Sequence, residues 1–407
     1  MVSKYDVLYV IATKGTVKVS EIVKALNKSK GEYNNIYNKV LELEKDGMIK
    51  RDTTIKFLHH KNSYQVFKII DYCIKNGMNY NILLKEKMVL FLEKALKKEF
   101  FTRDESTIHG QTFQQYTEAL ERYGLLLIVS RNPLKCKLLR HHLIMEIMKY
   151  FGKKQVFYKK SYESLIDEII KEVKKYKRRY KIDRILFENL EKREEVKFIY
   201  TSLSLEGNPI TLADTQKIIL EDVLPNTYKM NDVQEVTNYK KAIEQMIENT
   251  KKKVPVTLDL IREYHRLAMY HTEHAGMIRK QNVSIKGNPH FKTTDWKQLP
   301  EKLNELMRAY DVFQVKKKGI QEIIHFAAFF HNEFQRIHPF IDGNSRISRL
   351  IMLHILRSYD LPVLDLPLGY FDEYLDLTKR SQKRDDASFK SLVEEIVFFN
   401  LKRVNRE

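Results

Sequence analysis

Residues 338–349 read HPFIDGNSRISR and lead into a segment, 343–358, whose apolar residues recur at helical spacing. After Gly343, the first turn of that helix would bring unpaired backbone N–H groups and the positive end of the helix dipole together, which makes a ready anion site. Arg346 and Arg349 lie three residues apart and share a helix face. Because each guanidinium can fork across phosphate oxygens, the pair suits a polyphosphate better than a single carboxylate.

Two further side chains at this junction carry chemistry. Asp342 is suited to hold a divalent cation, since Mg²⁺ typically takes one or two carboxylates together with the phosphates of a substrate. His338 is suited to accept a proton from an attacking hydroxyl, because an unperturbed histidine titrates near neutral pH. Taken singly, such residues are usually capping residues or surface ion pairs. Together they predict a catalytic loop that binds phosphates.

The same twelve residues resemble the signature of the Fic family, H-P-F-x-[DE]-G-N-[GK]-R-x-x-R, and depart from it at Ser345. Upstream, AGMIRKQNVSIKGNPHF at 275–291 resembles the family's G-x-x-R-x-x-x-V-x-I segment, whose β-hairpin flap aligns the target. Downstream, DDASFKSLVEEI at 385–396 resembles the family's closing helix. We therefore expect residues 255–400 to be a Fic catalytic core.

The resemblance implies a mainly α fold, a Fic-type helical bundle with a small β-hairpin flap. It also implies a protein adenylyltransferase (AMPylation) that moves AMP from ATP, with Mg²⁺, onto a Ser, Thr or Tyr hydroxyl of the chain itself or of a target protein. By position, it assigns the general base to His338, the Mg²⁺ ligand to Asp342, the anion hole to Gly343, Asn344 and Ser345, the grip on the phosphates to Arg346 and Arg349, the loop anchor to Phe340 and the flap to Val283, Ser284 and Ile285. A Lys in place of Ser345 would indicate the family's phosphorylating members, whereas the small Ser favours AMP transfer.

An inhibitory motif lies on the N-terminal side of this core. Residues 202–207 read SLSLEG, which matches the family pattern [ST]-x-x-x-E-[GN]. The resemblance implies that Glu206 pairs with Arg349 and removes the cation that would hold the γ-phosphate of ATP. The alternative is a surface glutamate near a helix end, in a chain with 53 acidic residues. In relatives the same glutamate can support removal of AMP, so reversal is a further expected activity.

Residues 1–78 have the pattern of a winged helix-turn-helix domain. Val19–Asn27 reads as a short helix and Ile36–Glu44 as a recognition helix, and the alternating stretch 49–70 predicts two strands joined at His60–Asn62. The candidate DNA-contacting residues on or near the outer face of the recognition helix are Asn34, Asn35, Tyr37, Asn38 and Lys39, and those on the wing are Lys56, His59, His60 and Lys61. The alternative is a module that serves only for protein docking or dimerisation.

A fainter copy of this pattern predicts a second winged helix or helical domain over residues 79–155. LEKDGMI at 43–49 is echoed by LERYGLL at 120–126, after apolar and amphipathic helices and before a wing that turns at Asn132-Pro133. Residues 156–254 are expected to form a linker helix and the inhibitory helical region. Helical spacing is found at 158–180, 185–201, 213–220, 232–249, 257–270, 296–311, 318–336, 343–358 and 387–403, and a hairpin turn is expected at Lys286–Pro289. The chain lacks the G-x-x-x-x-G-K-[ST] and strand-borne G-x-G-x-x-G patterns, which leaves P-loop and dinucleotide folds without support.

The positive charge is concentrated in the N-terminal part of the chain. Of the net charge of +19, residues 1–160 carry +14 and residues 161–407 carry +5. Clustered Lys and Arg gain by releasing counterions from phosphates, which favours double-stranded DNA as a partner. Genome bias or thermophily offers another origin for a Lys-rich composition.

The alternative functions are a DNA-binding transcription regulator whose Fic core senses nucleotide without catalysis, and a toxin-like enzyme held inactive by its own segment.

Composition and cysteine usage bound the remaining classes. A chain of 407 residues with 43% apolar residues is expected to form two or three folded domains. Cys73 and Cys136 form no C-x-x-C, which argues against a disulfide framework and a cysteine zinc site. No apolar stretch is long enough to span a bilayer or serve as a secretory signal, so a cytoplasmic location is expected. Dimerisation is common in the family, and a homodimer is one expected partner.

Overall fold

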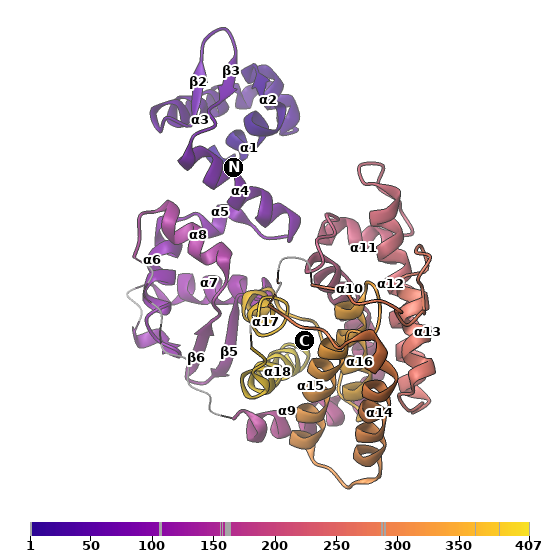
Figure 1. Cartoon of the computed structure of the whole chain (residues 1–407). Coiled ribbons are helices and arrows are strands. Elements are labelled where there is room, and N and C mark those ends of the chain that lie inside the picture. Colours follow the sequence, from indigo (N-terminus) through magenta and orange to yellow (C-terminus); the bar gives the residue numbers. More distant parts are fainter. Residues whose placement is uncertain are drawn as a thin grey trace. The chain divides into compact units, whose positions relative to one another are not determined.

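The computed structural model describes residues 2–105, 108–154, 156, 158, 164–285, 288, 290–362, 364–381 and 383–406. The chain divides into two compact units, Met1–Leu126 with Ser130–Lys159 and Leu127–Val129 with Lys160–Glu407. Both are mainly helical, and the two small three-stranded sheets are formed by strands within residues 16–57 and 101–138 (Figure 1). None of the helices in the described part of the chain combines the length and apolar character that a membrane crossing requires.

The first unit begins with three helices and a small sheet. These elements are α1 (Lys4–Lys14), β1 (Thr16–Val17), α2 (Val19–Ala25), η1 (Lys30–Glu32), α3 (Tyr33–Lys45), β2 (Ile49–Arg51) and β3 (Ile55–Phe57). The sheet order is β1-β3-β2, and both strand pairs are antiparallel. Ile36, Val40 and Leu43 recur at helical spacing on α3 and are fully buried. The assignment of residues 1–78 as a winged helix domain stays a prediction.

The predicted hairpin turn at His60–Asn62 is wrong. The chain turns between β2 and β3, over residues 52–54, and the second predicted strand is a helix, α4 (Lys61–Lys75). Val66, Ile69, Ile70 and Cys73 are buried at positions i, i+3, i+4 and i+7, so the helical period outweighs the local alternation of β-branched and aromatic residues. Cys73 and Cys136 are both buried, and no disulfide joins them.

The rest of the first unit contains the echoed heptapeptide. Its elements are α5 (Tyr80–Leu83), α6 (Glu86–Ala95), β4 (Phe101–Thr102), η2 (Arg103–Glu105), α7 (Gly110–Arg122), β5 (Leu126–Arg131), β6 (Leu134–Leu138) and α8 (His142–Tyr150). In both copies a helix ends in a glycine of positive φ, 69° at Gly47 and 71° at Gly124. The backbone N–H of the residue after each glycine donates to a carbonyl of the preceding helix: Met48 to Leu43 O at 2.9 Å and Leu125 to Leu120 O at 2.8 Å. The two copies of the heptapeptide therefore form the same type of helix C-terminus. The predicted turn at residues 132–133 is confirmed, since it lies between β5 and β6.

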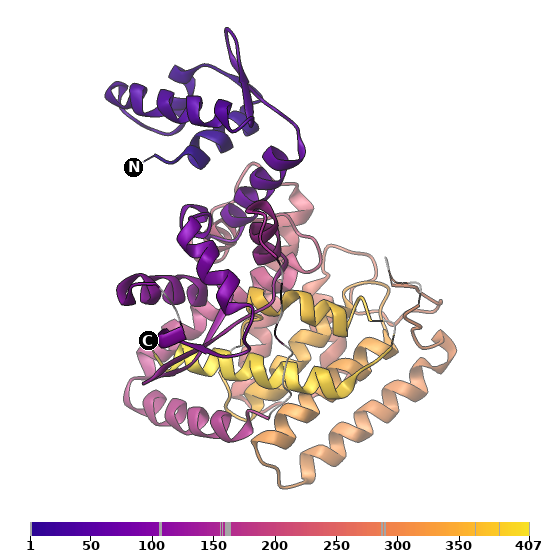
Figure 2. The same ribbon diagram turned by 90° about the vertical axis from the view of Figure 1, so that its left-hand side faces the viewer.

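The second unit is a helical bundle. Its elements are α9 (Ile166–Ile182), α10 (Arg184–Ser204), α11 (Leu212–Leu220), α12 (Met230–Lys251), α13 (Leu258–Ala268), η3 (Trp296–Gln298), α14 (Leu299–Val315), α15 (Ile320–Ile337), α16 (Asn344–Ser358), η4 (Leu368–Tyr370), α17 (Phe371–Leu377) and α18 (Asp386–Val404). Helix α15 packs against α16 and α18, as Figures 1 and 2 show, and α12 packs against α13 and α16. The expected helices of this region are confirmed with shifted ends.

The flap region contains one isolated antiparallel bridge, between Ile285 and Asn288. Residues 286, 287 and 289, on which the turn was predicted, lie outside the described residues. Helix α17 was not predicted from the sequence, because its seven residues give too few turns for an apolar period to be recognised. The division of the chain into four domains stays a prediction.

Candidate functional site

The loop between α15 and α16 has two residues in the left-handed region. His338 ends α15 at φ 52°, and Gly343 begins α16 at φ 76°. A Cβ added to Gly343 would lie 3.0 Å from Sδ of Met269 and 3.2 Å from Nε2 of His265. The backbone at position 343 is therefore open to glycine alone, both by conformation and by space.

Asn344 fastens this loop to the start of α16. Its Oδ1 accepts the N–H of Phe340 at 2.9 Å, and its Nδ2 donates to the carbonyl of Phe340 at 2.8 Å. The side chain of Asn344 is thus fully used within the loop. Its expected contribution to an anion hole reduces to its backbone N–H, which stands with those of Ser345 and Arg346 in the first turn of α16, where no preceding helical carbonyl is available.

A buried histidine, His265, packs against this loop and hydrogen-bonds to its backbone. The ring of His265 stacks on Phe340 with centroids 3.7 Å apart and planes at 11°. Nδ1 of His265 accepts the N–H of Gly276 at 2.8 Å, so its Nε2 carries the proton and donates to the carbonyl of Asp342 at 3.0 Å. Burial lowers the pKa of His265 to about 4, which keeps this tautomer neutral at pH 7. Phe340 is fully buried, as expected of an anchor.

His338 is held as a neutral base. Its Nδ1 lies 3.2 Å from the carbonyl oxygen of Gln335. Since a carbonyl can only accept, Nδ1 carries the proton and the lone pair of Nε2 is left to take one. Burial above all, with a smaller contribution from Arg279, lowers the pKa of His338 to about 4, against the raising effect of the Gln335 carbonyl.

Arg279 ties the flap segment to this loop. Its Nε donates to the carbonyl of His338 at 2.7 Å, its backbone N–H to Pro339 O at 2.9 Å, and its Nη1 to Gln281 O at 2.8 Å. Thr293 then bonds to the carbonyl of Val283 at 2.8 Å. Of the predicted flap residues, Ser284 is exposed and Val283 and Ile285 are half-buried.

Arg346 is a buried cation with unused hydrogen-bonding capacity. The residue is 4% exposed, and its Nη2 lies 3.1 Å from Asp342 Oδ2, while Nη1 lies 3.6 Å from Glu235 Oε1. Its Nε and Nη1 make no hydrogen bond to any residue that the structure describes. A buried guanidinium N–H without a partner costs stability, so an incoming anionic oxygen would be favourable here.

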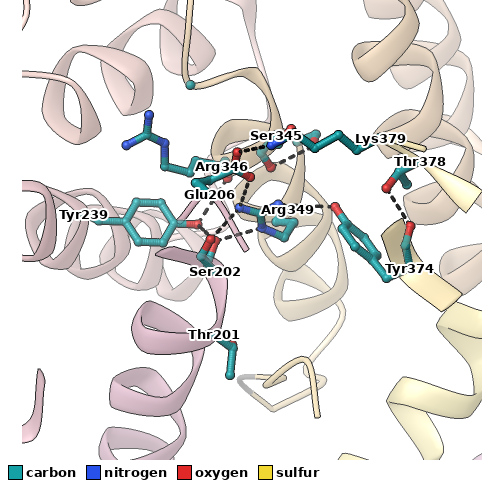
Figure 3. Close-up of polar contacts among 12 residues, drawn as sticks. Thr201, Ser202, Glu206, Tyr239, Ser345, Arg346, Arg349, Tyr374, Thr378 and Lys379 are labelled. Carbon is teal, nitrogen blue, oxygen red and sulfur yellow. Dashed lines mark hydrogen bonds and ion pairs between the residues drawn. The ribbon is translucent and has the colours of Figure 1, made fainter. Parts of the chain in front are cut away.

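Arg349 is also buried, but its guanidinium is already engaged (Figure 3). Its Nε donates to Ser202 Oγ at 2.8 Å, and its Nη2 donates to Ser202 O at 2.9 Å and to Glu206 Oε1 at 3.0 Å. Ser202 Oγ donates to the hydroxyl of Tyr239, which donates to Arg346 O at 3.1 Å. The end of α10 is thus connected to both arginines of α16.

Glu206 lies between two cations. Its other oxygen, Oε2, accepts from Nζ of Lys379 at 3.2 Å. Burial alone would raise the pKa of Glu206, but Arg349, Lys379 and Arg346 together hold that pKa below its ordinary value. The carboxylate is therefore ionised at neutral pH, and the ion pair is formed.

The carboxylate of Asp342 faces solvent, with 74% of its side chain exposed. One oxygen accepts the N–H of Gly343 at 2.6 Å and the other pairs with Arg346. One exposed carboxylate beside a phosphate-binding helix end fits the coordination of Mg²⁺, which keeps several waters and shares substrate phosphates. The unpartnered N–H groups of Arg346 and the first turn of α16 fit the phosphates of ATP.

The sequence predictions missed several residues of this site. Ser202 and Arg279 stand in the quoted family patterns but were given no role. Lys379, His265 and Tyr239 had no local signal, because each reaches the site from a distant segment.

The candidate DNA-contacting residues lie in the first unit, on or beside α3. Asn34 and Asn38 are exposed. Asn35 and Lys39 are half-buried and bond to Glu32 at 2.8 Å and to Glu42 at 3.1 Å. Of the residues predicted to lie on the wing, only Lys56 lies in the hairpin, on β3; His59 and His60 follow that strand and Lys61 begins α4, because residues 61–75 form a helix. All four are exposed.

Together, these elements define a helical bundle in which a loop bearing His338 leads into a helix with two buried arginines, Arg346 and Arg349. Residues 255–356 match the Fic/DOC family model, so this part of the chain is a Fic/DOC domain. It is 26% identical over 193 residues to the protein adenylyltransferase Fic of Drosophila erecta and 25% identical to that of Drosophila melanogaster. Each match covers 47% of this chain and 38% of the relative.

A solved structure shares the fold. A Fic-domain-containing signaling protein from Bacteroides thetaiotaomicron superimposes with a TM-score of 0.52 at 20% identity. The superposition covers 58% of this chain and 95% of that protein. The expected Fic fold is therefore confirmed.

Proposed function

We propose that this chain is a protein adenylyltransferase that transfers AMP from ATP to a Ser, Thr or Tyr hydroxyl and is inhibited by its own Glu206. The observation that carries the proposal is Arg346, whose buried guanidinium at the start of α16 keeps two nitrogens without a hydrogen bond to any described residue. The Drosophila relatives carry the name protein adenylyltransferase, which supports the same reaction.

In this proposal His338 is the general base. Its Nε2 accepts the proton of the target hydroxyl as the hydroxyl oxygen forms a bond to the α-phosphorus of ATP. The bond from that phosphorus to the bridging oxygen breaks, and pyrophosphate leaves with the electron pair. The negative charge of the bound phosphates raises the basicity of His338, which supports its role although its pKa is low without nucleotide.

Phosphate binding falls to the first turn of α16 and its arginines. The N–H groups of Asn344, Ser345 and Arg346 point where the helix dipole favours an anion. Asp342 would hold Mg²⁺, which neutralises charge on the phosphates. The flap, with exposed Ser284, would hold the target segment beside His338.

Glu206 supports the inhibition step. While it pairs with Arg349, that guanidinium has its Nη2 and Nε committed to Glu206 and Ser202, and the carboxylate repels an incoming phosphate. Movement of the end of α10 would free Arg349. The same carboxylate is proposed to support removal of AMP as a further activity, in which a water oxygen bonds to the phosphorus of the attached AMP and the target oxygen leaves and takes up a proton.

A second function is proposed for the N-terminal unit, which is binding of double-stranded DNA. The observation that favours it is the net charge of +14 over residues 1–160, together with the exposed Asn34, Asn38 and Lys56 on α3 and β3. In the rival reading, the chain is a transcription regulator whose Fic core binds nucleotide without turning it over.

The deciding experiment compares labelling by ATP that carries ³²P on the α-phosphate. We expect Glu206→Gly to label itself in Mg²⁺, and Glu206→Gly combined with His338→Ala to remain unlabelled. Glu172→Gln, which removes a carboxylate from the ion pair with Lys402, is the matched control and should behave as wild type. Labelling that survives His338→Ala would overturn the role of the base. Absence of label with both α- and γ-labelled ATP would favour the nucleotide-sensing regulator.

A further inference from the structure

A second cavity of about 390 Å³ lies at the other end of α16. It is lined by residues of α9, α10, α12 and α16 and by the segment after α16. Arg357 marks this end, eleven residues after Arg346, which is roughly 16 Å along a helix axis at 1.5 Å per residue. The residues of the candidate active site do not line it. The cavity is thus separate from the site proposed for ATP, and a ligand bound in it would not depend on that proposed function.

The wall of this cavity is strongly cationic. Its charged lining residues are Lys177, Lys181, Lys251, Lys253 and Arg357, against Glu191 and Asp360. Asp360 is shared between Lys253 at 2.7 Å and Lys177 at 3.4 Å. Lys181 and Lys251 form no ion pair with the residues that the structure describes. Five cations against two carboxylates leave a surplus of three positive charges facing one space.

Arg357 supplies a buried donor to this cavity. The residue is 9% exposed, and its Nη1 donates to Glu191 Oε1 at 3.1 Å, which also accepts the hydroxyl of Tyr176 at 3.1 Å. Its Nε is buried and has no hydrogen-bond partner among the described residues. One carboxylate therefore serves both Arg357 and Tyr176, so Glu191 only partly offsets the positive charge that Arg357 brings to the cavity wall.

Two aromatic rings complete the wall. Tyr176 and Tyr180 line the cavity with centroids 5.9 Å apart, and Tyr180 is half-buried, so its ring is accessible from the cavity. A volume near 390 Å³ falls in the range of small-molecule sites, which combine apolar or aromatic walls with a few polar groups. A flat ring can stack on tyrosine while phosphates meet the cations.

We propose that this cavity binds a small, multiply phosphorylated anion, of which a nucleoside polyphosphate makes the fullest use of the tyrosine rings. Arg357 and the unpaired Lys181 and Lys251 bind the phosphate oxygens. The surplus of three positive charges offsets most of the negative charge of such a ligand at neutral pH.

The test uses the full chain and isothermal titration with ATP and with inorganic tripolyphosphate, in Mg²⁺ at fixed ionic strength. Wild type should bind both probes at two sites. The exposed pair Lys181→Glu and Lys251→Glu should weaken one site at least tenfold and leave the other unchanged. Lys174→Glu with Lys241→Glu is the matched control, since both residues are exposed, lie on the same helices α9 and α12, and do not line the cavity. This control should retain both sites.

A third variant separates this site from the active site. Arg346→Ala should lose the site at the catalytic loop and keep the cavity site, and a thermal melt followed by circular dichroism checks that the variant folds. If Arg346→Ala does not fold, the number of binding sites in wild type is compared with that in the Lys181→Glu, Lys251→Glu variant, and this comparison tests the proposal. Tighter binding of ATP than of tripolyphosphate at the cavity site would support stacking of the adenine base on the tyrosine rings. A single site in wild type that Lys181→Glu with Lys251→Glu leaves unchanged, or equal weakening by both lysine pairs, would overturn the proposal.

Discussion

The Oε1 of Glu206 lies 3.0 Å from Nη2 of Arg349, although 143 residues separate the two along the chain. Ser202, one turn earlier on α10, already accepts from Nε and Nη2 of the same guanidinium. Lys379 holds the second oxygen of Glu206. One helix end therefore engages Arg349, and under the proposed function any signal that moves this end would change the proposed nucleotide site.

The affinity for ATP should report this contact directly. Glu206→Gln keeps the shape and one hydrogen bond but removes the negative charge, whereas Glu206→Gly removes both. We expect ATP affinity to rise at least tenfold in Glu206→Gly, about 1.4 kcal/mol, and by less in Glu206→Gln. Titration calorimetry at fixed Mg²⁺ measures both, with Glu172→Gln as the control. Unchanged affinity in both variants would count against an inhibitory role.

Lys379 should contribute less than Arg349 to holding Glu206 in its inhibitory position. It is 36% exposed in its side chain and shares Glu206 with the buried Arg349, so its removal leaves the stronger partner. We expect Lys379→Ala to raise self-labelling two- to fivefold, below the effect of Glu206→Gly. Lys383→Ala, an exposed lysine in the same segment, should leave labelling unchanged. A fall in labelling in Lys379→Ala would instead assign this lysine to the nucleotide.

The parts of the site that the sequence predicted are those encoded locally. The helix start after Gly343 and the shared face of Arg346 and Arg349 follow from spacing within one short segment. Lys379 and His265 enter from segments that the fold alone brings together, so no local period could reveal them. The N-terminal hairpin was misplaced because a local pattern was misleading. The β-branched and aromatic residues after residue 60 fit an alternating period, but their burial follows the helical period of α4.

Asn344 should be needed for the shape of the loop and not for charge. Its side chain satisfies both backbone groups of buried Phe340. Asn344→Ala leaves an N–H and a carbonyl without these partners, so we expect a loss of about 2 kcal/mol in the free energy of unfolding and a matching loss of labelling. Asn344→Asp should be no better, because its second oxygen would face the Phe340 carbonyl. Urea denaturation measures the first effect, and wild-type stability in both variants would contradict it.

Mild acid should destabilise the second unit through its buried histidines. Burial lowers the pKa of His331 to about 3 and that of His354 to about 4, from the ordinary 6.5. A histidine with a depressed folded pKa binds its proton more readily in the unfolded state. Its stabilising effect is therefore complete above pH 6.5 and is lost as pH falls toward 4.

We expect the free energy of unfolding in urea to fall steadily between pH 6.5 and 4.5. Each such histidine contributes a slope of up to about 1.4 kcal/mol per pH unit. His331→Gln removes one titrating group, so its slope should be shallower than that of wild type, whatever its stability at pH 7. A slope that the substitution leaves unchanged would contradict the assignment.

The N-terminal unit should bind duplex DNA through α3 and the β2–β3 hairpin. Phosphate contacts release counterions, so the affinity of the full chain should fall steeply and linearly on a plot of log affinity against log salt. Lys56→Glu on the hairpin should reduce that slope by about one, whereas Lys85→Glu, exposed in the same unit but outside these elements, should change it less. Asn34→Ala with Asn38→Ala should weaken discrimination between sequences and leave the salt slope unchanged, because amides read base edges and do not neutralise phosphates. Fluorescence anisotropy with labelled duplexes measures all three. Equal effects of Lys56→Glu and Lys85→Glu would reduce the interaction to net charge alone, and a flat salt response would remove DNA as a partner.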